Sequence, residues 1–387
     1  MKNELRIGLI GAGYMGKAHT VALKTVGPTF EPERTPVCEM IATSSDAGAA
    51  EFAGRWGWSR STGDWRALVD DPRVEAVIVA TPPRTHAAMV MACVAARKPV
   101  FCEKPLGTSA GESLALAEAV EGAGLPNMVG FNYIRTPASQ LAHQIIASGE
   151  IGEVIQVAAE HVEDYLHDPA LPASWRTRVA TGTEAGALGD VASHIVNACL
   201  RLVGPIDSLV ADTRIVQPMR HGPSGPEAVE NDDQGQMLLR FANGATGSLS
   251  FSRMAAGRKM GYTYRITGTR GAIHFDQEDQ NALWLYDAAR DPARRGFQKL
   301  LMGPAHPDYL AFNQGVGHGT GYNEQIAIEM RDFLRAIATG ESVWPTFRDG
   351  YEVDRVIAAA LVSHRERRWV SLREPTAESG VSRGSYA

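Results

Sequence analysis

The chain has 387 residues, enough for two domains that each bury a core of their own. A formal net charge of −6 leaves no basic surface that would attract nucleic acid or an anionic membrane, so we expect a small-molecule partner. No apolar run approaches the roughly 20 residues of a membrane helix, and residues 1–5 are too short and polar for a signal peptide, so we expect a cytoplasmic protein.

The first element is an apolar strand at residues 5–10, followed by Gly11-Ala12-Gly13-Tyr14-Met15-Gly16 and a helical stretch at 17–26. In a GxGxxG pattern the first glycine permits a tight turn, the second lets the backbone approach a pyrophosphate, and the third lets the helix pack on the strand. The phosphates then lie at the helix N-terminus. The pattern predicts a dinucleotide-binding turn.

Strand and helix patterns alternate up to residue 126. Apolar runs at 37–42, 76–80 and 100–102 are separated by helical patterns at 46–56, 84–96 and 109–121. This alternation predicts an α/β Rossmann domain, a doubly wound parallel sheet, over residues 1–126. The four cysteines form no CxxC pair and lie far apart in apolar stretches, so we expect reduced thiols and no metal site: Cys38, Cys93, Cys102 and Cys199.

Glu103-Lys104-Pro105 directly follows a buried-strand pattern at 99–102. Ligands of such sheets lie in the crevice outside the carboxyl ends of the strands, so we expect Lys104 to point into a cofactor cleft. The alternative is a solvated turn lysine.

The pattern changes beyond residue 127. Period-two strand patterns occur at 154–159, 209–216, 236–241, 246–251, 262–267, 272–275 and 282–286, and helical patterns at 190–202 and 322–338 are expected to cover one face of their sheet. We predict an α+β domain with a large open, mostly antiparallel sheet over residues 127–373, followed by a flexible tail at 374–387.

Asp190 and His194 are four residues apart in a helical pattern, a spacing that stacks them on one helix face. A carboxylate one turn away can orient an imidazole and favour its protonated form, which makes His194 a candidate general base for a hydroxyl proton. The alternative assigns Asp190 to a helix N-cap and His194 to the core.

Four motifs occur in a fixed order: Gly11-x-Gly13-x-x-Gly16, Ala80-Thr81-Pro82, Glu103-Lys104-Pro105 and Gly189-Asp190-x-x-x-His194. Together they resemble the glucose-fructose oxidoreductase and inositol dehydrogenase (Gfo/Idh/MocA) family, over roughly the whole chain. The resemblance implies a Rossmann domain and an open-sheet domain that carries substrate contacts and oligomer interfaces, in a tetramer or dimer. It also implies NAD as cofactor and a catalytic centre of Lys104, Asp190 and His194.

Finer motifs such as Phe131-Asn132-Tyr133 and Ser174-Trp175-Arg176 are similar to scyllo-inositol and levoglucosan dehydrogenases of that family. With the resemblance as guide, the expected cofactor-binding residues are Gly11, Gly13, Tyr14, Met15, Gly16, Thr43, Ser44, Thr81, Pro82, His86, Glu103, Lys104, Trp175 and Arg176. The expected substrate-binding residues are Lys104, Tyr133, Arg178, Asp190, His194 and His318. His318 is equally explained as part of a flexible surface turn, and arginines placed like Arg178 are usually only solvated surface residues.

Two positions depart from the family pattern. The second strand ends in Thr43-Ser44-Ser45, where an NAD-preferring member usually has an acid, but no arginine follows to bind a 2′-phosphate, so we favour NAD. Asp46 is expected to cap the next helix. Asn197 replaces the acid that relatives often carry three residues after the motif histidine.

The expected activity is NAD-dependent oxidation of a secondary hydroxyl on a cyclic polyol or pyranose. His194 would accept the hydroxyl proton, Asp190 would orient and charge the imidazole, and Lys104 would donate a hydrogen bond to the reacting oxygen. Glu103 would hold the nicotinamide ribose. Two alternatives remain open: a family member that keeps and recycles a tightly bound NAD, and a non-catalytic sugar or dinucleotide sensor.

Overall fold

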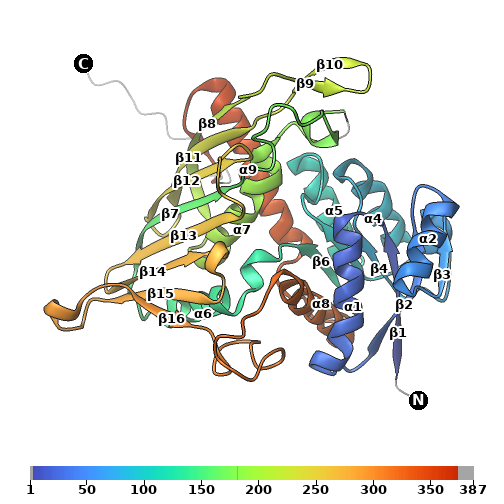
Figure 1. The fold of residues 1–387 in the computed structure, drawn as a ribbon, viewed down its shortest axis with the longest axis horizontal. Coiled ribbons are helices and arrows are strands. Elements are labelled where there is room, and N and C mark those ends of the chain that lie inside the picture. Colours follow the sequence, from blue (N-terminus) through green and yellow to red (C-terminus); the bar gives the residue numbers. More distant parts are fainter. Residues whose placement is uncertain (1–2, 181, 374–387) are drawn as a thin grey trace, which may run out of the picture.

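A computed structural model describes residues 3–180 and 182–373, and two β-sheets organise them (Figure 1). The expected tail at 374–387 lies outside the described residues. The first sheet has six parallel strands in the order β3-β2-β1-β4-β5-β6, the order of a doubly wound Rossmann fold. Its strands are β1 Glu4–Ile10, β2 Thr35–Ala42, β3 Arg60–Thr62, β4 Ala76–Val79, β5 Val100–Glu103 and β6 Asn127–Gly130.

The connecting helices are α1 Tyr14–Phe30, α2 Asp46–Trp56, α3 Trp65–Asp70, α4 His86–Ala95 and α5 Ala110–Gly122. β4 and β5 are buried at every residue, as strands between two helical layers should be. The predicted Rossmann architecture is confirmed. The expected cap of α2 is wrong, because the Ser45 side chain accepts from the Gly48 amide while Asp46 accepts from the Gly63 amide.

The first sheet extends past residue 126, the boundary expected from the sequence. β6 begins at Asn127 and pairs in parallel with β5, from Val100 opposite Asn127 to Glu103 opposite Gly130. A four-residue apolar run carries too little periodicity to be assigned to either sheet from the sequence alone.

The second sheet has nine strands in the order β16-β15-β14-β13-β7-β12-β11-β8-β17. All neighbours are antiparallel except β7 and β12, so the predicted open, mostly antiparallel sheet is confirmed. Its strands are β7 Val154–Val162, β8 Ile206–Arg214, β11 Gln234–Phe241, β12 Thr246–Ser252, β13 Gly261–Gly268, β14 Gly271–Asp276, β15 Ala282–Asp287, β16 Gln298–Leu301 and β17 Val370–Ser371. A separate hairpin joins β9 Met219–Gly222 and β10 Gly225–Ala228.

Helices α6 Pro137–Ala147, α7 Ser193–Leu202 and α9 Phe347–Glu366 share one buried core with this sheet. A π-helix at Leu188–Ala192 runs directly into α7. The expected position of the helix near 322–338 is wrong. α8 Tyr322–Thr339 buries Ile326, Met330 and Phe333 with α1 and β1 of the Rossmann domain, because α1 offers an apolar face there.

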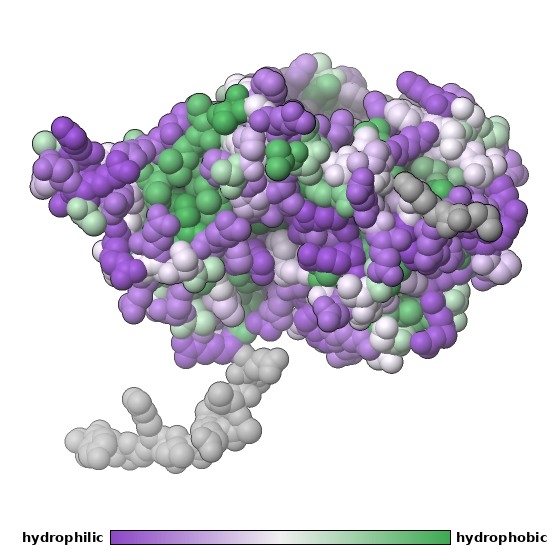
Figure 2. Space-filling view, turned by 90° about the horizontal axis from the view of Figure 1, so that it is seen from below, coloured by the Kyte–Doolittle hydropathy of each residue, from purple (hydrophilic) through white to green (hydrophobic). Residues whose placement is uncertain are grey.

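In the described part of the chain, no helix is both long and apolar enough to cross a membrane. Seen from below, the surface is mainly hydrophilic, with an apolar patch beside the protruding β15–β16 end (Figure 2). Phe297, Leu301 and Leu310 are exposed large apolar side chains of this part of the chain. All four cysteines are free thiols, as expected.

Candidate active site

The glycine turn between β1 and α1 has the backbone geometry that a pyrophosphate needs. Gly11 has φ +108°, and a Cβ there would overlap the Ala80 carbonyl oxygen. A Cβ at Gly16 would overlap the Gly11 carbonyl. A Cβ at Gly13, in contrast, would meet nothing within 4 Å. Gly13 is the N-cap residue of α1, and no side chain there accepts a hydrogen bond from the first amides of the helix. These amides are free to bind phosphate oxygens.

A cleft of about 810 Å³ opens beside this turn. One wall follows the carboxyl ends of β4, β5 and β6, which parallel pairing brings side by side. The other wall comes from β7, the loop after it and the π-helix. The predicted site residues that line the cleft are Gly13, Tyr14, Met15, Thr81, Pro82, Glu103, Lys104, Tyr133, Trp175, Arg176, Asp190 and His194.

Lys104 joins the two walls of the cleft. Its Nζ donates to the Asp190 main-chain oxygen at 2.7 Å and to Asp190 Oδ1 at 3.1 Å. The side chain is only 15% exposed, so the solvated-turn alternative does not describe it. Glu103, one residue earlier, is buried and lies 2.7 Å from His19 Nε2, which fixes one carboxylate oxygen beside the cleft.

Asp190 is held by three side chains from distant parts of the chain. Besides Lys104, Tyr165 donates its hydroxyl to Oδ2 at 2.8 Å, and Arg176 Nε lies 3.1 Å from the same oxygen. Burial alone would raise the pKa of this carboxyl, but the charges of Lys104 and Arg176 and the hydrogen bond from Tyr165 lower the pKa well below its ordinary value. Asp190 is therefore ionised.

The expected pairing of Asp190 with His194 is wrong in its geometry. The carboxylate makes no hydrogen bond to the imidazole in the described residues, because both of its oxygens face Lys104, Tyr165 and Arg176. The turn between the two residues is also a π-helix, so the spacing of an α-helix does not apply to it.

His194 is a buried, uncharged imidazole. Its ring centre lies 4.5 Å from that of Tyr133, and its Nδ1 is buried without a hydrogen-bond partner in the described chain. Burial, and then the charges of Lys104 and His161, lower its pKa well below the ordinary value. Asp190 does favour the protonated form, as expected, but burial and the charges of Lys104 and His161 outweigh its effect, so the net shift of the His194 pKa is downward.

A second histidine in the cleft was missed by the sequence analysis. His161 Nδ1 lies 2.7 Å from the Val191 main-chain oxygen, and its Nε2 lies 2.9 Å from Glu163 Oε1. A carbonyl only accepts, so Nδ1 donates the first of these hydrogen bonds. The available signal was weak: His161-Val162-Glu163 places polar residues at the end of an apolar strand.

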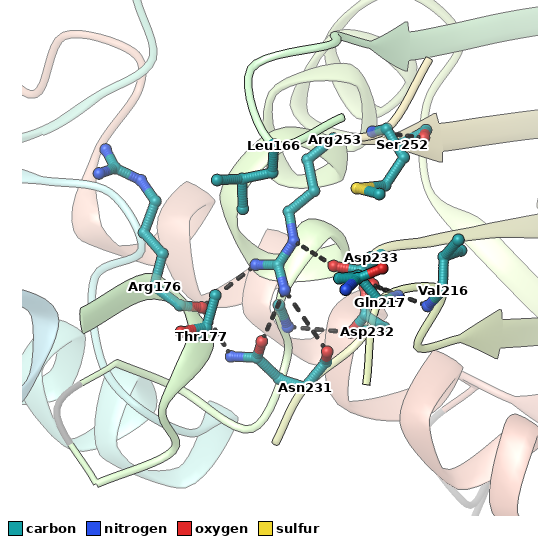
Figure 3. A network of polar contacts seen from close by, with 12 residues as sticks. Leu166, Arg176, Thr177, Val216, Gln217, Asn231, Asp232, Asp233, Ser252 and Arg253 are labelled. Atoms are coloured by element: carbon teal, nitrogen blue, oxygen red, sulfur yellow. Dashed lines mark hydrogen bonds and ion pairs between the residues drawn. The ribbon is translucent and has the colours of Figure 1, made fainter. Parts of the chain in front are cut away.

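A buried network around Arg253 supports the segment that carries Arg176 (Figure 3). Arg253 and Asp233, both without exposed side-chain surface, form an ion pair at 3.0 Å. Arg253 Nη1 also donates to the Arg176 main-chain oxygen at 3.1 Å, and Nη2 donates to Asn231 Oδ1 at 2.9 Å. The Asp232 carboxylate accepts from the amides of Gly186 and Leu188 at the start of the π-helix.

The structure does not bring every expected site residue to the cleft. Arg178 pairs with Glu227 at 2.5 Å, and His318 folds onto Gly315 in an exposed loop, so neither lines the cleft. Thr43 and Ser44 lie outside it at the end of β2, where the Thr43 hydroxyl donates to the Ser45 main-chain oxygen. His86 is fully buried and links the Thr81 carbonyl to those of Pro105 and Leu106, which supports two turns of the cleft.

Other cleft residues have no counterpart in the sequence analysis. They come from four separate segments, which only the fold brings together: Glu163, Tyr165, Met260, Gln277, Gln280 and Tyr322. Among the described residues, no group of three or more His, Cys, Asp or Glu is placed to hold a metal ion.

Comparison with known proteins agrees with this geometry. Residues 5–131 match a family model described as an oxidoreductase family with an NAD-binding Rossmann fold, and residues 139–274 match a GFO/IDH/MocA C-terminal domain. The chain belongs to the Gfo/Idh/MocA oxidoreductase family. Its first domain is therefore an NAD-binding Rossmann domain, and NAD is the cofactor of the cleft.

Among its relatives, levoglucosan dehydrogenase of Pseudarthrobacter phenanthrenivorans is 38% identical over 97% of this chain and 100% of its own. Myo-inositol 2-dehydrogenase of Thermotoga maritima is 26% identical over 96% of this chain and 99% of its own. A solved structure of levoglucosan dehydrogenase in complex with NADH and levoglucosan superposes with a TM-score of 0.94, at 38% identity, over 96% of this chain and 100% of that chain.

Proposed function

We propose that the protein is an NAD-dependent dehydrogenase that oxidises a secondary hydroxyl of a pyranose sugar or cyclic polyol to a lactone or ketone. One observation carries the proposal: the neutral imidazole of His194 and the ammonium of Lys104 line the same cleft as the dinucleotide turn. Oxidation of an alcohol needs a hydride acceptor and a proton acceptor in one place. A binding module would need neither a base nor an ammonium beside it.

NAD supplies the hydride acceptor when it is bound. His194 accepts the hydroxyl proton, and it can do so at neutral pH because its lowered pKa keeps the ring uncharged. Lys104 donates a hydrogen bond to the reacting oxygen and stabilises the negative charge that develops there. An ammonium has three N–H groups, and Asp190 uses two of them, so one is left for substrate.

Asp190 acts through Lys104 rather than through His194. Its main-chain and side-chain oxygens fix the direction of the ammonium, and the hydrogen bonds from Tyr165 and Arg176 fix Asp190 in turn. Tyr133 packs against the His194 ring at a tilt of 59° and shapes the substrate side of the cleft. Gly13, Tyr14, Met15, Thr81, Pro82 and Glu103 line the cofactor side.

Two experiments test the proposal, the first of them a substrate panel. Levoglucosan, scyllo-inositol, myo-inositol and an aldohexose are each incubated with NAD and with NADP, while the absorbance of reduced cofactor is followed. The similarity to levoglucosan dehydrogenase puts levoglucosan first, and we expect NAD to be preferred because no arginine follows Thr43. Reduction that disappears in His194→Gln supports the proposal. Sugar binding without reduction would make the protein a sensor instead.

The second experiment asks whether NAD exchanges. Gel filtration of the purified protein, followed by an absorbance spectrum, shows whether cofactor stays bound. We expect the protein to release NAD, because the first amides of α1 open directly into the cleft. Retained cofactor would favour the family members that recycle it. A homo-oligomer stays a prediction, for which the elution volume in the same run gives the mass.

A further inference from the structure

A second cleft, of about 530 Å³, lies apart from the dinucleotide cleft and shares no lining residue with it. It is bounded by the short helix Tyr133–Arg135, by residues of α6 and α7, by the C-terminal half of α8 and by the segment 339–344. Four guanidinium groups line it: Arg135, Arg201, Arg331 and Arg335. The only carboxylates in its described lining are Asp332 and Glu341. Such a local excess of positive charge contrasts with the chain's net charge of −6.

A single buried carboxylate serves most of these arginines. Asp332 accepts from Arg135 Nη1 through Oδ2 and from Arg331 through Oδ1 at 2.9 Å, while Arg335 lies 3.6 Å from the same Oδ1. Arg135 also donates to the Trp344 main-chain oxygen, and Arg331 also contacts Asp308. Arg335 is 58% exposed, so its pair with Asp332 is weak.

Arg201 has no anionic partner in the described part of the chain. Within residues 3–180 and 182–373 its guanidinium makes no hydrogen bond or ion pair, and its central carbon lies 4.7 Å from the ring centre of Trp344. The guanidinium of Arg135 lies 5.2 Å from the centre of the same ring. Arg201 is exposed, so its guanidinium is accessible to a ligand from solution. Two guanidinium groups, those of Arg135 and Arg201, thus pack against the Trp344 ring, and only Arg135 is paired with a carboxylate, that of Asp332.

We propose that this cleft binds a phosphate group, either free phosphate or the phosphate of a small phosphomonoester. Arg201 and Arg335 line the cleft with N–H groups that form no hydrogen bond to Asp332. A guanidinium can donate to two phosphate oxygens at once. The volume exceeds what a single oxyanion needs, and the Trp344 ring offers an apolar wall for an organic group. Bound phosphate would remove the repulsion between Arg201 and Arg135.

The short helix between the clefts links this site to the first one. Tyr133, at its start, lines the dinucleotide cleft beside His194, and Arg135, at its end, lines the second cleft. A phosphorylated effector bound to Arg201 would therefore lie one short helix away from the base. The binding site itself stands independently of the proposed dehydrogenase activity, so its test requires no turnover.

Isothermal titration calorimetry tests the proposal on protein saturated with NAD, so that the pyrophosphate site is filled. The probes are inorganic phosphate, phenyl phosphate and benzoate, which has the same ring but only one negative charge. We expect both phosphates to bind, and benzoate to bind at least about tenfold more weakly than phenyl phosphate. If phenyl phosphate binds more tightly than inorganic phosphate, the cleft is a phosphomonoester site. If the two affinities are equal, it is a site for free phosphate.

Arg201→Gln and Arg335→Gln should each weaken phosphate binding at least about tenfold, since each removes a charged donor. Arg66→Gln is the matched control, because Arg66 also stacks on an indole, 4.2 Å from the ring centre of Trp65, but lies outside the cleft. It should leave the affinity unchanged. Absence of phosphate binding, equal binding of benzoate, or unchanged affinity in Arg201→Gln would overturn the proposal. The two arginine variants are independent, so one failure to fold leaves the other as the test.

Discussion

The dinucleotide turn and the π-helix that carries Asp190 face the same cleft, but they are built in opposite ways. The turn is local: Gly11, Gly13 and Gly16 act through backbone conformation and close approach within one strand and one helix. The surroundings of Asp190 are not local, because Lys104, Tyr165 and Arg176 reach it from other elements. The steric requirements of the glycine turn can therefore be deduced from sequence spacing. The charge state of Asp190 cannot, because it depends on contacts that only the fold creates.

The largest expected effect concerns the two residues to which we assign a catalytic role. Lys104→Met and His194→Gln should each lower kcat by about 10²- to 10⁴-fold, because a proton-transfer or charge-stabilising group is lost. NAD affinity, measured by fluorescence titration, should stay within a few fold of wild type, since the turn is untouched. Turnover close to wild type in either variant would remove that residue from the mechanism.

The glycine turn gives the next effect, through two glycines with opposite surroundings. Gly13→Ala places its Cβ in open space, so thermal unfolding should not change, but the methyl group would stand where the pyrophosphate approaches and should weaken NAD binding at least about tenfold. Gly16→Ala would overlap the Gly11 carbonyl and should lower the unfolding temperature as well. Gly54→Ala, also in open space but within α2, is the control: it should leave NAD affinity unchanged and raise the unfolding temperature slightly, because alanine has a higher helix propensity than glycine. Unchanged NAD affinity in Gly13→Ala would contradict the placement of the phosphates.

The sequence analysis succeeded where the signal was local or strongly periodic. The alternation before residue 127 and the period-two strands after it predicted both sheets, and Lys104 was placed in the cleft by the rule for strand ends. It failed for α8, whose apolar face fits either domain, and for the interruption of the helix at Asp190. His161 and Tyr165 could not be assigned, since nothing in their own segment shows that the π-helix packs against it.

The buried network around Arg253 allows a stability test that compares a buried ion pair with a partly exposed one. Arg253→Met leaves Asp233 without its partner in a fully buried position and should lower the free energy of unfolding by about 3–5 kcal/mol. Arg178→Met removes an ion pair whose side chains are 32% and 31% exposed, and should cost less than about 1 kcal/mol. Urea unfolding of both variants makes the comparison. Similar losses would show that the network does not support the Arg176 loop as described.

Arg178→Met and His318→Ala also test the limits of the cleft. Neither residue lines it, so kcat/KM for an inositol and for a pyranose should stay within about twofold of wild type, which is below 0.5 kcal/mol. A change in the ratio of kcat/KM between the two substrates would show that these side chains contact the substrate.

The smallest expected effect is a shift in pH dependence. His161→Gln removes a charge that lowers the pKa of His194, so the acid limb of kcat/KM should move to higher pH in this variant. Lys104→Met should move the limb in the same direction in its residual activity. A shift to lower pH in both variants would contradict the electrostatic description of the cleft.

The pH profile of kcat/KM for the wild-type protein tests the central claim most directly, that His194 acts as a buried base kept neutral by its surroundings. Because the pKa of His194 is lowered, the base form persists as the pH falls through about 6.5, the ordinary value for histidine, and is lost only at lower pH. The account predicts a constant kcat/KM across that value, with the acid limb well below it. An acid limb with a midpoint at or above about 6.5 that is absent from His194→Gln would show that the imidazole is readily protonated, and would contradict the account.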